Sequence, residues 1–186
     1  MRSKRLFSKK NTHLNLTIKY IRGSDVKKRN INNHDNWATP VEFCKELDKE
    51  FHFDFDPCPY NHDMSWDGLL MEWGKSNFIN PPYSRMLKEA FIMKAIAESK
   101  KGKICVMLLP VSTSTKIFHE YILPNVAEIR FVYKRLKFSG YNTKGQYVTN
   151  KCGMHDSMLI IFDGRNNCIR VVLNIWKHLK RLFNER

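Results

Sequence analysis

Short apolar runs alternate along the chain with segments in which apolar residues recur at helical spacing. The runs predict strands at 51–56, 76–79, 103–109, 128–133 and 158–162, because each has strand length and most are bounded by Pro, Gly or charged residues. Segment 103–109 is apolar almost throughout, which is typical of a strand buried in a parallel sheet.

Helical spacing between these runs predicts helices after Pro40, after Tyr83 and before Pro124. Pro40 is expected at the first helical position of its helix. A basic amphipathic helix is expected over residues 169–186, and the Gly- and Tyr-rich segment 139–153 is expected to form a loop. Alternating strands and helices predict an α/β domain with three layers and a mostly parallel sheet.

The length of the chain suits one domain. It has 186 residues, 42% of them hydrophobic, and this is enough to bury a core. We expect the folded domain to span residues 37–186. Residues 1–36 are polar and basic around one short expected strand, Leu14 to Ile21. They are interpreted either as a mobile arm that touches nucleic acid or as a disordered leader.

The charge of the chain is strongly positive. Lys and Arg number 32 against 18 Asp and Glu, which gives a formal net charge of +14. A phosphate backbone is the commonest partner of such a surface, and a merely solvated basic surface is the alternative.

Other features of composition bear on location and on metals. No apolar run reaches the roughly 18 residues of a membrane helix, and no apolar signal region opens the chain, so a soluble, cytoplasmic protein is expected. The five cysteines are scattered singly, which favours reduced thiols, and no metal site is expected.

The tetrapeptide Asn80-Pro81-Pro82-Tyr83 lies between an expected strand and an expected helix. Ligands bind at such strand ends in open α/β sheets. The side-chain oxygen of Asn80 and the carbonyl of Pro81 can accept both protons of a planar amino group, which favours its nitrogen as positive charge develops. Tyr83 can stack on a base that is flipped out of a duplex. The pattern predicts methylation of an exocyclic or amide nitrogen, with a plain Pro-Pro loop as the alternative.

The tetrapeptide belongs to a longer series of segments in a fixed order. They are Trp37-Ala38-Thr39-Pro40, Phe53-Asp54-Phe55-Asp56-Pro57, Trp73, Asn80-Pro81-Pro82-Tyr83-Ser84, Leu108-Leu109-Pro110, Phe118-His119, Leu123-Pro124, Glu128-Ile129-Arg130-Phe131 and Arg135-Leu136-Lys137-Phe138. The series resembles the phage-type DNA N6-adenine methyltransferases, which are small Dam-like enzymes. The resemblance implies a Rossmann-like methyltransferase fold whose mostly parallel sheet has an antiparallel edge. It also implies S-adenosylmethionine as methyl donor and adenine in DNA as acceptor.

The same resemblance assigns roles to single residues. It implies that the tetrapeptide is catalytic, with no covalent enzyme intermediate. It implies two sets of cofactor-binding residues, Trp37, Thr39 and Pro40 at the methionine end and Asp54, Asp56 and Pro57 beside the first strand's loop. Residue chemistry alone leaves alternatives, since Asp56 can bind the cofactor or cap a helix, and Thr39 can touch a ligand or serve as a helix N-cap.

One segment departs from the pattern of many amino methyltransferases, which place a Gly-containing loop after the first strand. Here that place reads Asp56-Pro57-Cys58-Pro59-Tyr60, and no glycine follows until Gly68. The ribose-binding acid has no evident candidate. A nucleic-acid-binding protein that keeps the fold without activity is therefore an alternative.

Basic and aromatic residues of the second half are expected to contact DNA. They are Arg130, Lys134, Arg135 and Lys137, for phosphates, and Tyr141 and Tyr147, for the gap left by a flipped base. Segment 139–153 is the expected reader of target sequence. Amino groups of guanine in RNA or of glutamine in a protein are the alternative acceptors.

Overall fold

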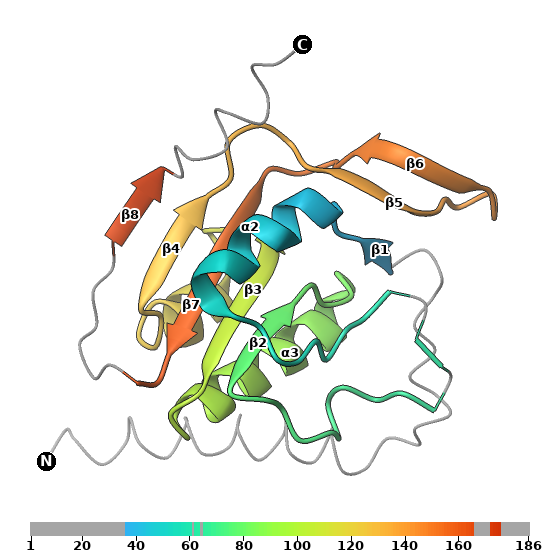
Figure 1. Ribbon diagram of the computed structural model, residues 1–186. Helices are drawn as coiled ribbons and strands as arrows, with labels where there is room; N and C mark the ends of the chain where they lie inside the picture. The colour runs from blue at the N-terminus through green and yellow to red at the C-terminus, as the bar shows by residue number, and fades with distance from the viewer. Residues whose placement is uncertain (1–35, 61, 64, 166–171, 176–186) are drawn as a thin grey trace, which may run out of the picture.

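The computed structural model describes residues 36–60, 62, 63, 65–165 and 172–175, and its main sheet has five strands (Figure 1). In spatial order these are β2 (Ser76–Ile79), β3 (Ile104–Pro110), β7 (Ser157–Asp163), β4 (Glu128–Phe131) and β8 (Val172–Ile175). The α/β class is confirmed.

The sheet is mixed, because β7 runs against both of its neighbours. β2 is parallel to β3, and β4 is parallel to β8, but β7 pairs antiparallel with β3 and with β4. The prediction of a mostly parallel sheet with an antiparallel edge is therefore wrong in both respects. A strand that is buried on both faces is apolar whichever way it runs, so hydrophobic pattern carries no information about strand direction.

Helices cover both faces of this sheet, α2 (Val41–Phe51) on one side and α3 (Arg85–Ser99) on the other. Successive residues of β3 point to opposite faces. Cys105, Met107 and Leu109 belong to the hydrophobic cluster that includes α3 and the short π-type helix η2 (Phe118–Ile122). The intervening residues of β3 belong to the cluster that includes α2. The helices and the sheet thus form the three layers that the sequence predicted.

A second, smaller sheet lies beside the first. It contains β1 (Trp37–Ala38), β5 (Lys137–Tyr141) and β6 (Tyr147–Cys152) in the order β1-β5-β6, all antiparallel. Figure 1 shows β5 and β6 as a long hairpin that projects from the rest of the domain. The prediction of a loop over 139–153 is wrong. Most of β6 is exposed on both faces, so no apolar alternation marks it as a strand.

Two further predictions need correction. Helix α2 continues through Phe51, and within the expected strand 51–56 only Phe55 makes a bridge, to Asn77 of β2. Residues 172–175 form strand β8 rather than part of a helix. The rest of the expected C-terminal helix beyond β8, and the basic arm apart from Asn36, lie outside the described residues. Within the part of the chain that the structure describes, no helix has the length and apolar character needed to cross a bilayer.

Candidate functional site

The tetrapeptide forms the turn between β2 and α3. β2 ends at Ile79, which pairs with Met107 of β3, and α3 begins after Ser84. Pro81 and Pro82 are buried, and each fixes its own backbone angle while biasing the preceding residue toward an extended conformation. The turn therefore presents Asn80 and Tyr83 at the carboxyl end of β2, the strand at one edge of the main sheet.

Hydrogen bonds fix which way the Asn80 amide faces. Its nitrogen, Nδ2, donates to the Trp37 carbonyl at 2.9 Å and to the Thr39 hydroxyl at 3.0 Å. A backbone carbonyl can only accept, so the nitrogen must face Trp37 and the oxygen must face the other way. The oxygen, Oδ1, accepts from the Tyr83 hydroxyl at 3.2 Å. Asn80 thus presents a hydrogen-bond acceptor on the side of Tyr83.

Thr39 does not cap helix α2. The N-cap position is Pro40, and no side-chain hydrogen bond caps this helix end. The Thr39 hydroxyl instead accepts from Asn80, across the gap between α2 and β2. The N-cap alternative for Thr39 is therefore wrong.

Tyr83 is half-buried beside Asn80. Burial raises the pKa of Tyr83 well above its ordinary value, so the phenol keeps its proton and can donate to Oδ1 of Asn80. Its ring also lines one of the two cavities that flank the turn.

The first cavity, which we call the Asp56 cavity, has a volume of about 470 Å³. Residues from β1, the start of α2, the loop after α2 and β2 surround it. Its lining consists of Trp37, Ala38, Thr39, Val41, Cys44, Lys45, Asp48, Phe53, Asp56, Cys58, Tyr60, Phe78 and Asn80. It combines aromatic rings with two carboxylates, and its size falls in the range of small-molecule sites.

Asp56 gives this cavity an unusual carboxyl group. Burial raises the pKa of Asp56 from 3.8 to about 6, although the Cys58 amide and the nearby His62 both act to lower it. Oδ1 accepts from the Cys58 amide at 2.7 Å, a bond within the loop rather than a helix cap. Oδ2 has no hydrogen-bond partner among the described residues, so it can accept from a ligand.

Two thiols also line the Asp56 cavity. Burial, with the nearby charge of Asp56, raises the pKa of Cys44 to about 12 and raises the pKa of Cys58 as well. Both thiols stay protonated near neutral pH and are therefore weak nucleophiles.

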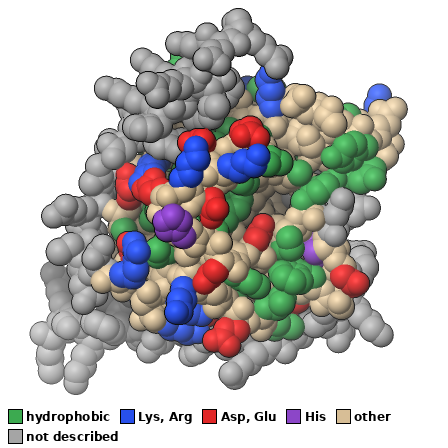
Figure 2. All heavy atoms as spheres, in the orientation of Figure 1, with side chains coloured by type: hydrophobic (Ala, Val, Ile, Leu, Met, Phe, Trp, Pro, Cys, Tyr) green, Lys and Arg blue, Asp and Glu red, His purple; other side chains and the backbone are tan. Residues whose placement is uncertain are grey.

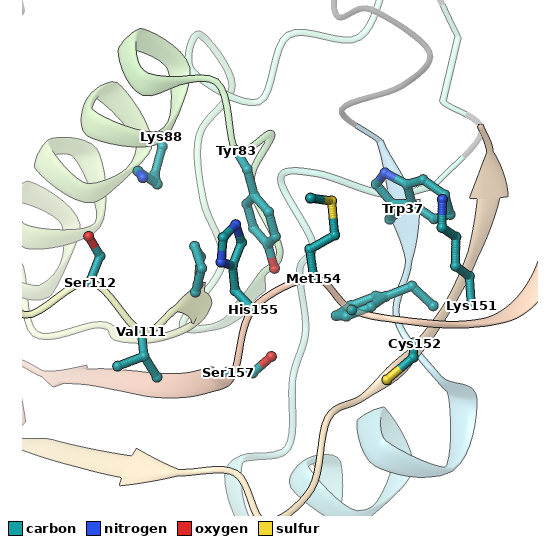
Figure 3. A pocket seen from close by; sticks show the side chains of 13 residues that line it. Trp37, Tyr83, Lys88, Val111, Ser112, Lys151, Cys152, Met154, His155 and Ser157 are labelled. Atoms are coloured by element: carbon teal, nitrogen blue, oxygen red, sulfur yellow. The ribbon is translucent and has the colours of Figure 1, made fainter. Parts of the chain in front are cut away.

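The second cavity, which we call the His155 cavity, lies on the Tyr83 side of the turn and has a volume of about 360 Å³ (Figure 3). Its lining consists of Trp37, Tyr83, Lys88, Pro110, Val111, Ser112, Phe138, Lys151, Cys152, Gly153, Met154, His155 and Ser157. In Figure 3 the side chains of Tyr83, His155 and Met154 lie together in the centre of the view. None of these lining residues is acidic, whereas two are lysines.

Trp37 lines both cavities and forms part of the wall between them. Its strand, β1, pairs with β5, and its indole lies so close to Gly140 that a Cβ there would meet the ring at 2.9 Å. The ammonium of Lys151 lies 5.4 Å from the centroid of the Trp37 ring, a cation–π contact. The hairpin therefore holds Trp37 against the turn.

The structure does not bring Asp54 into this group. Its carboxylate accepts from the backbone amides of Lys75 and Ser76, at the amino end of β2. Gly74 must lack a side chain because a Cβ there would meet Oδ1 of Asp54 at 2.1 Å. Asp54 holds the start of the strand, while Asp56, two residues later, lies in the cavity at its other end.

Pro57 lies behind the loop rather than in the cavity. It is buried, and its carbonyl accepts from the indole nitrogen of Trp66 at 3.0 Å. A Cβ at Gly68 would approach that carbonyl to 1.9 Å. Gly68, the first glycine after the loop, thus allows the chain to pack closely against Pro57.

Arg130 lies inside an ion-pair network. Its guanidinium donates to both oxygens of Glu50 at 2.6 Å and to Glu128 at 2.8 and 2.9 Å, and it stacks over Phe51 at 5.3 Å. Burial acts to lower the pKa of Arg130, but these bonds outweigh it and raise the pKa. The side chain joins α2 to β4 and is not available to a phosphate.

The other residues expected at DNA lie at the surface. Lys134 and Lys137 are exposed, and Arg135 pairs with exposed Asp156 at 3.0 Å. Tyr141 and Tyr147 face each other across the hairpin with ring centroids 5.3 Å apart. Figure 2 shows hydrophobic side chains at the surface on the hairpin side, while Lys, Arg, Asp and Glu are intermixed over α2.

Several lining residues escaped the sequence analysis. Asp48, Tyr60 and Phe78 join the Asp56 cavity, and Lys88 and His155 join the His155 cavity. Lys88 carried a usable signal, because it lies in the first turn of α3, directly after the tetrapeptide. His155 carried none, since only the pairing of β7 with β3 brings it near the turn. Within the described ranges no group of three or more His, Cys, Asp or Glu is arranged to hold a metal ion.

Comparison with known proteins identifies the family of this chain. The model of the family described as DNA N-6-adenine-methyltransferase (Dam) matches residues 24–180. Searches of curated proteins and of solved structures returned no match. The family match covers most of the chain, including β1, the tetrapeptide and the hairpin, so the chain belongs to the DNA N-6-adenine-methyltransferase (Dam) family.

Proposed function

We propose that this protein transfers a methyl group from S-adenosylmethionine to the N6 amino group of adenine in DNA, with the target nucleotide flipped out of the duplex. The observation that carries the proposal is the fixed orientation of Asn80. Asn80 lines the cavity that contains carboxylates, and its oxygen accepts from Tyr83, which lines the cavity that contains two lysines.

The residues of the Asp56 cavity fit S-adenosylmethionine. Aromatic rings such as Tyr60 and Phe53 suit its adenine, and the open oxygen of Asp56 suits its ammonium or ribose hydroxyls. Lys45 suits its carboxylate. When bound, the cofactor supplies an activated methyl group. The loop that lacks glycine contributes Asp56, Cys58 and Tyr60 to this cavity, so its side chains would contact the cofactor.

Asn80 and Pro81 would activate the acceptor. Oδ1 of Asn80 and the carbonyl of Pro81 would accept the two protons of the adenine amino group. These bonds strengthen as the nitrogen gains positive charge, so they favour the transition state over the bound substrate. Tyr83 would lie along the flipped base, and its hydroxyl helps to keep Oδ1 in place.

The His155 cavity suits the nucleotide. Lys88 and Lys151 supply positive charge near the turn, and Trp37 and Tyr83 supply aromatic faces. Exposed Lys134 and Lys137 would extend this positive surface, with Arg135, toward the phosphates of the duplex. Tyr141 and Tyr147, which are 41% and 51% exposed, would contact the duplex from the hairpin. We leave Arg130 out of the DNA-binding set because carboxylates already surround it.

The direct test is incubation of the purified protein with DNA, or with RNA, and S-adenosylmethionine labelled in its methyl group. Mass spectrometry of the released nucleosides should find labelled N6-methyladenine from DNA. A label in methylguanine from RNA would instead support the RNA alternative. The remaining alternative is a nucleic-acid-binding protein without activity. Calorimetry with S-adenosylmethionine tests it, because an absence of cofactor binding would support that alternative.

A further inference from the structure

We propose that Thr39 is a positioning residue that holds the side-chain amide of Asn80 in place for the reaction. This inference rests on the proposed function, because it concerns how the catalytic acceptor is held. Thr39 itself would touch neither the adenine amino group nor the methyl group.

Each N–H group of the Asn80 amide has its own acceptor. An Asn side chain carries two N–H donors, and both need acceptors once the group is shielded from water. At Asn80 the two acceptors are the Trp37 carbonyl and the Thr39 hydroxyl, at 2.9 and 3.0 Å. The carbonyl selects the orientation of the amide, since it cannot donate. The hydroxyl supplies the second anchor, which stops the amide plane from rocking about the first bond.

The local structure around Thr39 directs its hydroxyl toward Asn80. A Thr-Pro pair at the start of a helix normally predicts that the hydroxyl caps the helix. In α2 this cap is absent, and the hydroxyl is turned toward Asn80 instead. Because Thr is branched at Cβ, few side-chain rotamers are open to it, so its hydroxyl is held where β1 and α2 place it.

The same hydrogen bonds polarise the Asn80 amide. As its two N–H groups donate to Trp37 and Thr39, the acceptor lone pairs push electron density toward the amide nitrogen, and resonance passes it on to the C=O oxygen. Chains of hydrogen bonds strengthen one another in this way in a medium of low polarity. Oδ1 would therefore be a better acceptor for an amino group that gains positive charge.

Thr39→Val tests the proposal, since valine has the same shape but no hydroxyl. We expect kcat at saturating DNA and cofactor to fall about tenfold, the size of one lost hydrogen bond to a group that must stay in place. The dissociation constant for S-adenosylmethionine should change less than about twofold. Thr39→Ser keeps the hydroxyl and should restore most of the lost kcat.

Hydrogen exchange of the Asn80 side-chain amide gives a readout that needs no activity. Its proton signals can be assigned by their loss in Asn80→Ala. In Thr39→Val the exchange should accelerate about tenfold, and in Thr39→Ser it should stay near that of the parent protein. Ser76→Ala is the matched control, because it removes a buried hydroxyl that donates to the Phe51 carbonyl at the opposite end of β2. It should leave both kcat and the Asn80 exchange unchanged.

The outcomes separate this inference from the proposed function. Thr39→Val with unchanged kcat and unchanged exchange overturns the positioning role. A variant whose only defect is weaker cofactor binding also overturns it, because Thr39 would then be a cofactor contact. A parent protein that methylates no DNA overturns the proposed function, while the exchange measurement still decides whether Thr39 holds the Asn80 amide.

Discussion

The two cavities that flank Asn80 are built from different chemistry. The Asp56 cavity contains Asp48 and Asp56 and one lysine, whereas the described lining of the His155 cavity contains Lys88 and Lys151 and no carboxylate. A polyanion is repelled by the first set and attracted by the second. A ligand with an ammonium and hydroxyl groups prefers the first. Under the proposed function, this difference favours the Asp56 cavity for the cofactor and the His155 cavity for the nucleotide.

Loss of Asn80 should have the largest effect, because Asn80 would hold the reacting amino group. In Asn80→Ala we expect kcat to fall by about 10²–10³, as when one preorganised group of an active site is removed. DNA and cofactor affinities should change little. Asn125→Ala, which removes an amide bonded to the Tyr121 carbonyl, is the control. Normal turnover in Asn80→Ala would rule out the catalytic role of the turn.

Arg130→Ala tests a charge that belongs to neither cavity. The change leaves partly buried Glu128 and half-exposed Glu50 without the guanidinium that pairs with both. We expect the free energy of unfolding to fall by about 3 kcal/mol, which urea denaturation can measure. Salt dependence of DNA binding should be unchanged in the folded variant. A smaller salt slope with normal stability would instead place Arg130 at a phosphate.

Asp56→Asn should damage the cofactor side alone. We expect the affinity for S-adenosylmethionine to fall about tenfold at pH 8, because a charged acceptor becomes a neutral one. DNA affinity, measured without cofactor, should be unaffected. The opposite pattern, with DNA binding lost and cofactor binding kept, would reverse the assignment of the two cavities.

The raised pKa of Asp56 gives a pH dependence with a definite sign. The carboxylate is ionised above about pH 6 and becomes protonated below it. Cofactor affinity should therefore be full above that pH and decline as the pH falls through it. The free energy of unfolding should instead rise as the pH falls from about 6 to 3.8, because in this range the folded state binds the Asp56 proton more readily than the unfolded state does. Asp56→Asn should remove both dependences in calorimetric titrations.

Lys151→Glu should have the smallest effect, confined to DNA. We expect DNA affinity to fall several-fold at low salt and the salt slope to decrease by about one phosphate contact. Cofactor affinity should stay within twofold. Lys116→Glu, a charge reversal at an exposed lysine outside the lining of the His155 cavity, is the control. Equal losses in both variants would mean that only net charge matters.

The sequence predicted the centre of the site better than its surroundings. Strands β2, β3 and β7, helix α3 and the turn between β2 and α3 were recognised because their apolar pattern is local. The direction of β7 was not predicted, because its antiparallel pairing with β3 and β4 depends on contacts that the hydrophobic pattern does not encode. The hairpin was missed because β6 is mostly exposed.

The sequence also could not predict which of the two carboxylates, Asp54 or Asp56, lies in the cavity. Asp54 and Asp56 are two residues apart on one short segment. Only the bridge between Phe55 and Asn77 sets the register of this segment against β2. That register leaves Asp54 at the amino end, bonded to Ser76, and brings Asp56 to the opposite end. The partners of Asn80 were equally hidden, because Trp37 and Thr39 lie far from it along the chain.

The pairing of β1 with β5 also sets the order in which the site is completed during synthesis. Trp37 leaves the ribosome early, but its strand partner, Gly140, follows only after most of the main sheet. Domains tend to fold as units once their chain is available. A nascent chain that ends before the hairpin therefore lacks the strand that holds Trp37 against Asn80. Competence for the proposed methyl transfer should therefore appear only after the hairpin has been synthesised.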